Sequence, residues 1–260
     1  MNHQKRYIRY LILLTILLVF AVNELRVYLK VNSWSEPLTV QIITINGDGA
    51  ETTGRYIRSL VQHDIVKISS FLSHEASKYS ISEKPVKILQ LKKGLSSRPP
   101  DLPGEMNVFS NIYWSIRFRV WSAWTLYQAN VPHADITLFV KYFDPLKHQT
   151  LQHSIGLQKG MVGIINAFAS KEYNGSNNVI IAHELLHTVG ATDKYHFENN
   201  FPFYPAGFSD PHRKPLYPQT RAEIMGGRIP LSSFETAIPT SLDEVVVGDL
   251  TALEIGWKPL

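Results

Sequence analysis

The sequence predicts an α/β (α+β) fold in which helices pack against one sheet. Short apolar segments bounded by breakers are typical of strands, and longer segments with apolar residues at helical spacing are typical of helices. These segments follow the order strand, helix, strand, helix and then three strands. Hydrophobic residues make up 44% of the chain and charged residues 18%, which is a globular composition, and 260 residues suffice for one sizeable domain.

The strands are predicted from short runs rich in β-branched residues. Leu38–Ile45 is such a run and leads into the turn sequence Asn46-Gly-Asp-Gly49. Val86–Leu91 is a second, shorter run. The same pattern predicts three further strands, over Asp135–Phe143, Thr150–Gln158 and Met161–Ala169.

Two long helices are expected between these strands. Apolar residues recur at helical spacing from Thr53 to Lys78 and again from Glu105 to Gln128. One side of the second helix is strongly apolar, and we predict that it packs into the core and does not form a partner surface. The side chains on that side are Phe109, Tyr113, Ile116, Val120 and Trp124.

The N-terminus is typical of an export signal. Lys5, Arg6 and Arg9 precede an apolar run from Leu11 to Val22. The run is shorter than the ~20 residues of a full span, but it approaches that length if it is counted from Tyr7. We expect an uncleaved, single-pass membrane anchor whose basic flank stays in the cytoplasm, with the rest of the chain outside.

Signal cleavage is the alternative for this segment. Val19-Phe20-Ala21 is a possible cleavage site, which would give a secreted or periplasmic protein. The expected domain organisation is therefore residues 1–31 as basic flank, anchor or signal segment and linker, and residues 32–260 as one domain.

Composition excludes several classes of function. The chain has no cysteine, so disulfides, thiolate metal sites and cysteine nucleophiles are excluded. The net charge is +4, and the basic residues are scattered outside the N-terminus, so no nucleic-acid partner is expected. The sequence gives no indication of the oligomeric state.

The segment His183-Glu184-Leu-Leu-His187 carries the predicted chemistry. Ser176 or Asn177 can cap a helix that begins just before it. The two histidines are four residues apart, so they share one helix face and can bind one zinc ion. Glu184 is rotated about 100° from His183, where a general base can reach a water without occupying a ligand position.

The third ligand must come from beyond this helix. A continued helix would rotate Asp193 about 600° from His187, which points it away from the metal. Gly190 can end the helix in a left-handed conformation, after which Asp193 can return as a carboxylate ligand. His196 lies three residues further along the chain and is a rival third ligand.

The segment from His183 to Asp193 resembles the metzincin zinc metallopeptidases. Their pattern is H-E-x-x-H-x-x-G-x-x-H, and the aspartate in the last position is similar to the snapalysin branch. Glu223-Ile-Met225-Gly-Gly227 resembles the family's methionine turn, with Met225 beneath the metal and Gly190 at the preceding bend. The resemblance implies a twisted mixed sheet, a backing helix, an active-site helix and a small C-terminal subdomain with a final helix.

The resemblance also assigns parts to other segments. Leu38–Ile45, Thr53–Lys78 and Thr150–Ala169 would supply sheet, backing helix and the strand nearest the cleft. A capping-box sequence at Ser241 would begin the final helix, Val245–Ile255. The proline-rich segment Phe197–Gln219 would either wall the substrate pocket or form a rigid covering loop.

One departure from the family concerns the oxyanion. Some metzincins carry a tyrosine two residues after the turn methionine, where this chain has Gly227. Zinc alone, Tyr195 or Tyr217 would then stabilise the oxyanion. The absence of cysteine also excludes latency of the cysteine-switch type.

We therefore expect a zinc-dependent endopeptidase that uses Glu184 as general base on a peptide or protein substrate. The metal ligands would be His183, His187 and Asp193. Two alternatives stay open: a membrane-tethered zinc-containing binding protein that cleaves nothing, and a zinc hydrolase acting on a non-peptide amide.

Overall fold

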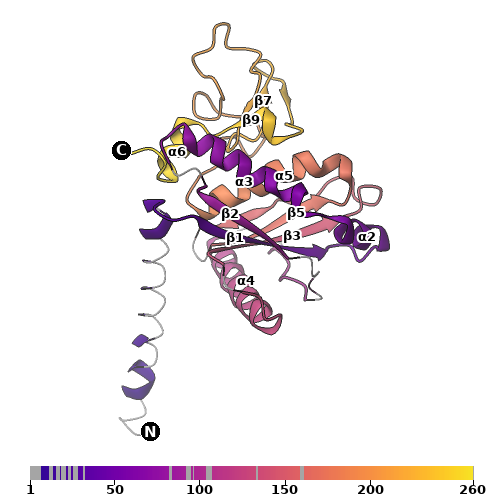
Figure 1. The fold of residues 1–260 in the computed structure, drawn as a ribbon, viewed down its shortest axis with the longest axis vertical. Coiled ribbons are helices and arrows are strands. Elements are labelled where there is room, and N and C mark those ends of the chain that lie inside the picture. The colour runs from indigo at the N-terminus through magenta and orange to yellow at the C-terminus, as the bar shows by residue number, and fades with distance from the viewer. Residues whose placement is uncertain are drawn as a thin grey trace.

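The computed structural model describes residues 33–259, apart from 82–83, 92–94, 96, 104–106, 133 and 159–160, together with scattered residues between 7 and 31. Its centre is a five-stranded sheet with the strand order β2-β1-β3-β5-β4 (Figure 1). The strands β2, β1, β3 and β5 are parallel, and β4 is antiparallel at the edge. Their bounds are β1 (Leu38–Asn46), β2 (Val86–Leu91), β3 (Ile136–Phe143), β4 (Ile155–Leu157) and β5 (Val162–Phe168).

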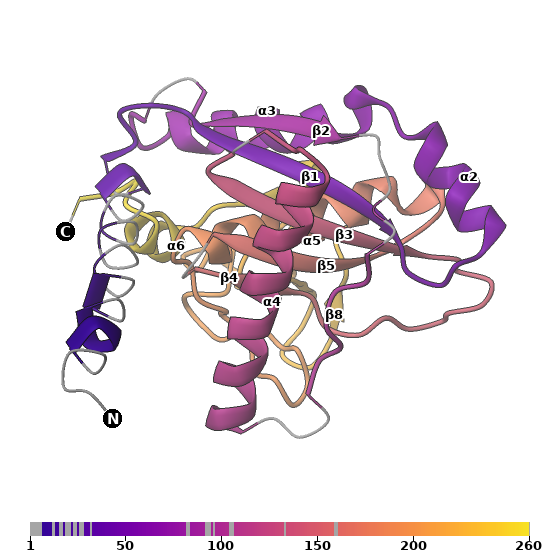
Figure 2. The same cartoon turned by 90° about the horizontal axis from the view of Figure 1, so that it is seen from below.

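Helices cover both faces of the sheet. The helices α3 (Gln62–Ser77) and α5 (Asn174–Thr188) lie on one face, and α4 (Val108–Gln128) lies on the other (Figure 2). Alternate residues of β1 separate two cores, because successive strand side chains point to opposite faces. Ile42 belongs to the core shared with α3 and α5, whereas Ile43 packs in the core shared with α4. The predicted α/β class is confirmed at this level.

The long helix predicted over Thr53–Lys78 is two helices, so that prediction is wrong in its continuity. α2 (Glu51–Ser59) is followed by Leu60, whose ψ of 131° is extended, and Val61 is extended as well. The backbone N–H of Val61 donates to Asp64 at 2.9 Å, which begins α3. The apolar spacing continues through this break, so periodicity alone could not locate it.

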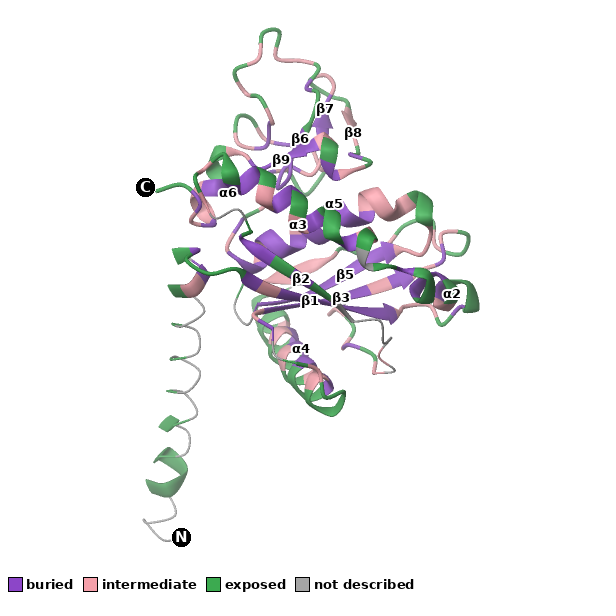
Figure 3. Ribbon diagram, viewed as in Figure 1, coloured by how far each residue is buried: buried purple, intermediate pink, exposed green. Residues whose placement is uncertain are grey.

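The core-facing side predicted for the second long helix is also wrong. Phe109, Val120 and Trp124 are 84%, 64% and 58% exposed, while Trp114 and Phe118 on the opposite side of α4 are buried. Figure 3 shows much of α4 in the green of exposed residues. Trp114 and Phe118 stack at 5.2 Å between ring centroids in the core beneath the sheet. Because α4 is apolar around most of its circumference, its sequence could not indicate which side faces inward.

Two predicted elements near the site are shorter than expected. The strand predicted over Thr150–Gln158 is reduced to β4, Ile155–Leu157. The helix predicted over Val245–Ile255 is only α6 (Asp249–Glu254), because the chain is extended at its N-cap, Gly248. Ser241 instead caps the short 3-10 helix η2, through a bond from the backbone of Asp243 at 3.3 Å. The remaining elements are η1 (Lys171–Tyr173), β6 (Ala222–Glu223), β7 (Ile229–Pro230), β8 (Thr236–Ala237), η2 (Leu242–Glu244) and β9 (Val245–Val246).

The predicted linker is partly packed into the domain. The indole N–H of Trp34 donates to the carbonyl of Ile255 at 2.7 Å, and Val31 is buried. Lys30 forms an ion pair with Asp135 at 2.7 Å. The packed domain therefore begins before residue 32, the predicted boundary.

Most of the predicted anchor, including Lys5 and Arg6, lies outside the described residues. Tyr7–Leu11 is helical and exposed, and the described apolar residues from there to Leu29 are exposed as well. Within the part of the chain that the structure describes, no helix is both long enough and apolar enough to span a bilayer.

Candidate metal centre

The helix α5 carries the two histidines and Glu184. It begins at Asn174, and its N-cap, Tyr173, makes no capping bond through its side chain, so the predicted cap at Ser176 or Asn177 is wrong. Asn177 instead binds both backbone groups of Phe168, at 3.1 Å and 2.9 Å. These bonds tie the first turns of α5 to the end of β5 and so set the position of the residues two to three turns later.

The end of α5 brings the third candidate ligand back. Gly190 has φ +113°, a conformation that favours glycine, as the sequence predicted. The backbone N–H of Ala191 then bonds the carbonyl of Leu186 at 3.0 Å, which closes the turn. Asp193 follows in the loop segment after this turn.

The three candidate ligand atoms converge on one point. Nε2 of His183 and Nε2 of His187 are 3.1 Å apart. Oδ1 of Asp193 lies 3.2 Å from each of them. A tetrahedral zinc ion with nitrogen and oxygen ligands at ~2.05 Å holds those ligands roughly 3.3 Å apart. The triangle therefore has edges close to those that a zinc ion needs.

Hydrogen bonds on the far side of each ring decide which nitrogen faces this point. Nδ1 of His183 donates to the carbonyl of Ile224 at 2.9 Å, and Nδ1 of His187 donates to that of Ala191 at 2.8 Å. A neutral imidazole with its proton on Nδ1 presents a lone pair at Nε2. Asp193 Oδ1 is buried and accepts no hydrogen bond from the described residues. Three lone pairs that face one another repel unless a cation lies between them, so this donor set fits zinc.

The same carboxylates shift the pKa values of the site. Burial lowers the pKa of His183, but Asp193 and Glu184 outweigh it and raise the pKa to about 9. Burial raises the pKa of Asp193, but the two histidines close to its carboxylate, His183 and His187, outweigh burial and hold that pKa well below its usual range. The site therefore attracts positive charge, as a proton or as a metal ion.

Glu184 is placed beside the ligands. One of its carboxylate oxygens and one ring nitrogen of each histidine lie within 4.8 Å of one another. The side chain is buried, and its Oε2 has no hydrogen-bond partner among the described residues. Burial raises the pKa of Glu184, which makes it a stronger base than a solvated carboxylate. Geometry and basicity are both those of a proton acceptor next to a metal-activated water.

Gly156 of β4 lets the edge strand approach α5. A Cβ at this position would lie 2.3 Å from the carbonyl oxygen of Glu184 and 2.7 Å from Cβ of His187. Any larger residue would push the strand away from the helix. The close approach places the edge of the sheet beside the candidate catalytic residues.

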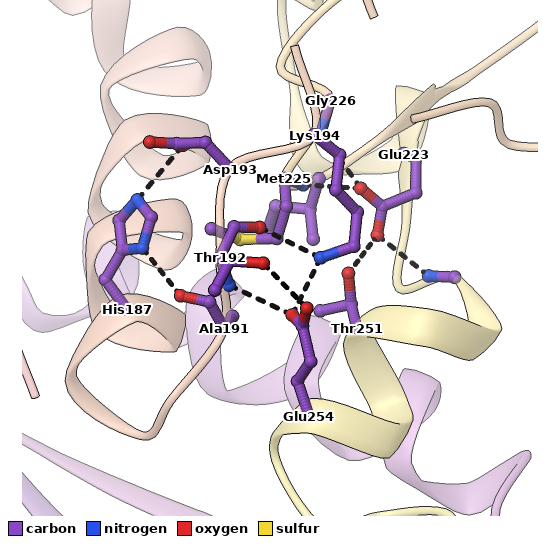
Figure 4. Close-up of polar contacts among 12 residues, drawn as sticks. His187, Ala191, Thr192, Asp193, Lys194, Glu223, Met225, Gly226, Thr251 and Glu254 are labelled. Atoms are coloured by element: carbon purple, nitrogen blue, oxygen red, sulfur yellow. Dashed lines mark hydrogen bonds and ion pairs between the residues drawn. The ribbon is translucent and has the colours of Figure 1, made fainter. Parts of the chain in front are cut away.

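The predicted methionine turn lies on the other side of the ligands. Met225 is fully buried, and its carbonyl accepts from the backbone of Lys194, next to Asp193, at 2.8 Å. The carboxylate of Glu223 holds the turn, because its Oε2 accepts from the backbones of Met225 and Gly226 at 2.7 and 2.9 Å (Figure 4). The carbonyl of the residue between Glu223 and Met225 accepts from His183, so this turn also orients one ligand.

A second carboxylate, Glu254 of α6, fixes the residues on both sides of Asp193 (Figure 4). Lys194 is buried, and its Nζ donates to Glu254 at 2.7 Å and to the carbonyl of Thr192 at 2.9 Å. Thr192 also donates to Glu254 from its backbone and its hydroxyl, at 2.9 and 2.6 Å. Sequence reasoning missed Lys194 and Glu254, because no local pattern links residues 60 positions apart.

A cavity of about 390 Å³ opens beside His183 and Glu184. Its walls include Arg228 and the apolar side chains Phe168, Val179, Ile180, Ile224 and Ile238. The segment Phe197–Gln219 contributes Asn200 to this lining. Elsewhere it folds on itself, with the Gln219 side chain bonded to Asp210 and its neighbours. The segment thus contributes one residue to the lining, and the turn around Met225 contributes Ile224, Gly226 and Gly227.

The other candidates named from the sequence lie differently. His196 is exposed, and its ring packs against Phe203 at 5.4 Å between centroids. Tyr195 lines the cavity, whereas Tyr217 packs against Phe208. Burial, together with the charges of Asp193 and Glu184, raises the pKa of Tyr195, so its hydroxyl stays protonated.

Comparison with known proteins adds no assignment. No protein-family model matches the chain, and no curated protein matches its sequence.

Proposed function

We propose that this protein is a zinc-dependent endopeptidase of metzincin-like type. The observation that carries the proposal is the convergence of three lone pairs, from His183, His187 and Asp193, at 3.1–3.2 Å from one another. Two imidazoles and a carboxylate leave one position open on a tetrahedral zinc ion, which is the arrangement of a catalytic site. Glu184 lies beside the two histidines with a buried oxygen that has no hydrogen-bond partner among the described residues.

Four features of the fold support the proposal that the endopeptidase is of metzincin-like type. α3 packs behind the sheet next to α5, as a backing helix would. β4 is an antiparallel edge strand beside the site. A methionine turn centred on Met225 follows the ligand helix, and α6 lies near the C-terminus. The departure at Gly227 leaves the family's usual tyrosine position without a phenol.

The residues of this chain divide the proposed chemistry among them. A bound zinc ion supplies Lewis acidity, which lowers the pKa of water and polarises the scissile carbonyl. Glu184 takes a proton from the attacking water, whose oxygen forms the new bond to the carbonyl carbon. Glu184 then returns that proton to the leaving amine as the carbon–nitrogen bond breaks. Tyr195 lines the same cavity with a protonated hydroxyl, which can donate to the developing oxyanion.

The substrate that best fits the cleft is an extended peptide. β4 is at the sheet edge and pairs with β5, so its outer side can accept a further strand. The adjoining cavity, about 390 Å³ with a mostly apolar surface, fits one large apolar side chain of that peptide.

We also propose that the N-terminal segment tethers the enzyme to a membrane. The support is the sequence pattern: Arg9 and its basic neighbours precede the apolar run Leu11–Val22. The catalytic domain would then act on peptides or proteins outside the cytoplasm.

Activity and metal content of four variants test the proposal on the full chain. Glu184→Gln should keep stoichiometric zinc and lose peptide hydrolysis by about 10²–10⁴-fold, because it removes the base and leaves the ligands. His183→Ala and Asp193→Ala should lose zinc and activity together. His196→Ala is the matched control, because its exposed ring lies away from the three ligands.

Three results would count against the proposal. Zinc lost from the His196 variant and kept by the Asp193 variant would reverse the ligand assignment. Undiminished hydrolysis by the Glu184→Gln variant would show that Glu184 is not the general base. Full zinc content with no cleavage of a broad peptide library, by the full chain and by a form lacking residues 1–29, would favour a tethered binding protein or a hydrolase of non-peptide amides.

A further inference from the structure

The outward side of α4 is an apolar surface of unusual size. Its four aromatic residues, which include Phe109 and Trp124, are 58–84% exposed. At roughly 150–250 Å² per aromatic side chain, these four alone expose on the order of 500 Å². Four aliphatic side chains extend the patch. We call the eight residues the α4 stripe: Val108, Phe109, Ile112, Tyr113, Ile116, Val120, Trp124 and Tyr127.

The α4 stripe is continuous along the helix. Its members recur at spacings of three and four residues, so they fall within one half of the helix surface. Trp114 and Phe118, which fix the helix to the sheet, lie on the opposite half. The stripe residues therefore lie on the half of α4 that does not pack against the sheet. Apolar patches of this extent mark a surface that meets a partner or a lipid bilayer.

The charges of α4 identify the kind of partner. The helix carries Arg117 and Arg119 and no acidic residue. Arg117 lies against the ring of Tyr113 at 5.6 Å, beside the stripe. Tryptophan, tyrosine and arginine around an aliphatic centre form the composition of a helix that lies in a membrane interface, with cations at anionic headgroups.

The position of α4 points the same way. Figure 1 shows α4 on the face of the sheet away from α3 and α5, and the described parts of the N-terminal segment extend towards the same side. Leu11, Leu14 and Leu18 in that segment are each 62–63% exposed. One bilayer on this side of the molecule would cover both apolar surfaces.

We propose that α4 docks the domain onto an anionic lipid surface through the α4 stripe. The cavity beside His183 is walled by α5, by residues beyond it, and by β5 with the segment before β4, and none of its lining residues belongs to α4. Docking through the α4 stripe therefore uses none of the residues that line the cavity. The domain would be held against the membrane in one orientation, with its site open to extramembrane peptides. This inference requires neither zinc nor catalysis.

A single introduced cysteine tests the docking, since the chain has none of its own. Val120→Cys places a polarity-sensitive fluorophore at the centre of the stripe. Phe234→Cys is the matched control, because Phe234 is also apolar and exposed but lies between β7 and β8, in the C-terminal part beyond α5. Both full-length proteins are reconstituted into vesicles of phosphatidylcholine with and without phosphatidylglycerol.

We expect a several-fold rise in emission and a blue shift for the label at 120 in vesicles with phosphatidylglycerol, and neither for the label at 234. Substituting Arg117 and Arg119 by glutamine should reduce the response to that seen with phosphatidylcholine alone. Equal, water-like emission at both positions would overturn the proposal. Rapid disulfide formation between two copies at Cys-substituted Val120 in lipid-free detergent, with no lipid response, would assign the surface to a second copy of the chain instead.

Discussion

Replacing Glu223 by glutamine should destabilise the protein by an amount that its contacts define. Oε2 of Glu223 accepts from two backbone N–H groups, and Oε1 accepts from the backbone of Gly248 at 3.0 Å and from the hydroxyl of Thr251 at 2.7 Å. The NH2 group of the glutamine costs the least free energy in the place of Oε1, because the Thr251 hydroxyl can rotate there and accept a hydrogen bond from it. The N–H of Gly248 is then left facing another donor.

The cost follows from these contacts. One unpaired buried N–H costs about 1–3 kcal/mol, and the loss of a charged acceptor adds about 1 kcal/mol, so the loss in unfolding free energy is about 2–4 kcal/mol. For a domain of this size, that lowers Tm by about 5–15 °C. Zinc affinity should also fall, by about 10–100-fold, since the turn after Glu223 orients the His183 ligand.

Denaturant unfolding of the zinc-free protein measures the first quantity, and Glu75→Gln supplies the control. Glu75 is also buried, but it accepts from one backbone N–H, that of Val247, and from the half-exposed Lys78. Its amide can keep the first bond, and Lys78 can turn to water, so the loss should be about 1 kcal/mol or less. Equal stability of wild type and Glu223→Gln would refute the four-donor arrangement.

Three further predictions concern the site itself. Gly156→Ala should destabilise by about 1–3 kcal/mol and lower kcat/KM, because its Cβ would lie 2.3 Å from the Glu184 carbonyl oxygen; unchanged kinetics would contradict the close approach of β4. Tyr195→Phe should lower kcat by about 10²–10³-fold with little change in KM, and a wild-type kcat would leave zinc as sole oxyanion partner. In the zinc-free protein, the pKa of His183 is raised from 6.5 to about 9. Protonation of His183 therefore adds about 3 kcal/mol to the free energy of unfolding; this stabilisation is complete below pH 6.5 and is lost as pH rises through 9. The Tm of the zinc-free protein should therefore fall between pH 6.5 and 9.5, and the Tm of the Asp193→Asn variant should change less over the same range.

The sheet strands were predictable because their information is local. Leu38–Ile45 and Asp135–Phe143 are apolar, β-branched runs between turns, and the strands β1 and β3 match them within one residue at each end. The break between α2 and α3 was not predictable from pattern, because Leu60 and Val61 continue the apolar spacing through it. The shortness of β4 likewise depends on its pairing with β5.

The candidate site divides in the same way. The spacing of His183 and His187 and the offset of Glu184 follow from helix geometry, which local sequence controls. The choice between Asp193 and His196 depended on where the returning chain is held. Contacts with residues far along the sequence, from α6 and the methionine turn, hold it.

By itself, the sequence determined an α/β domain with a helical His-Glu-His motif, a glycine bend and an apolar N-terminus, since each depends on residues within one or two turns of each other. Only the tertiary structure decided that Asp193 meets both histidines and that Lys194 pairs with Glu254. It alone decided which side of α4 faces solvent. The physical reason is that these features are settled by packing between distant segments, and a helix apolar all round or a carboxylate in a loop carries no local record of its partner.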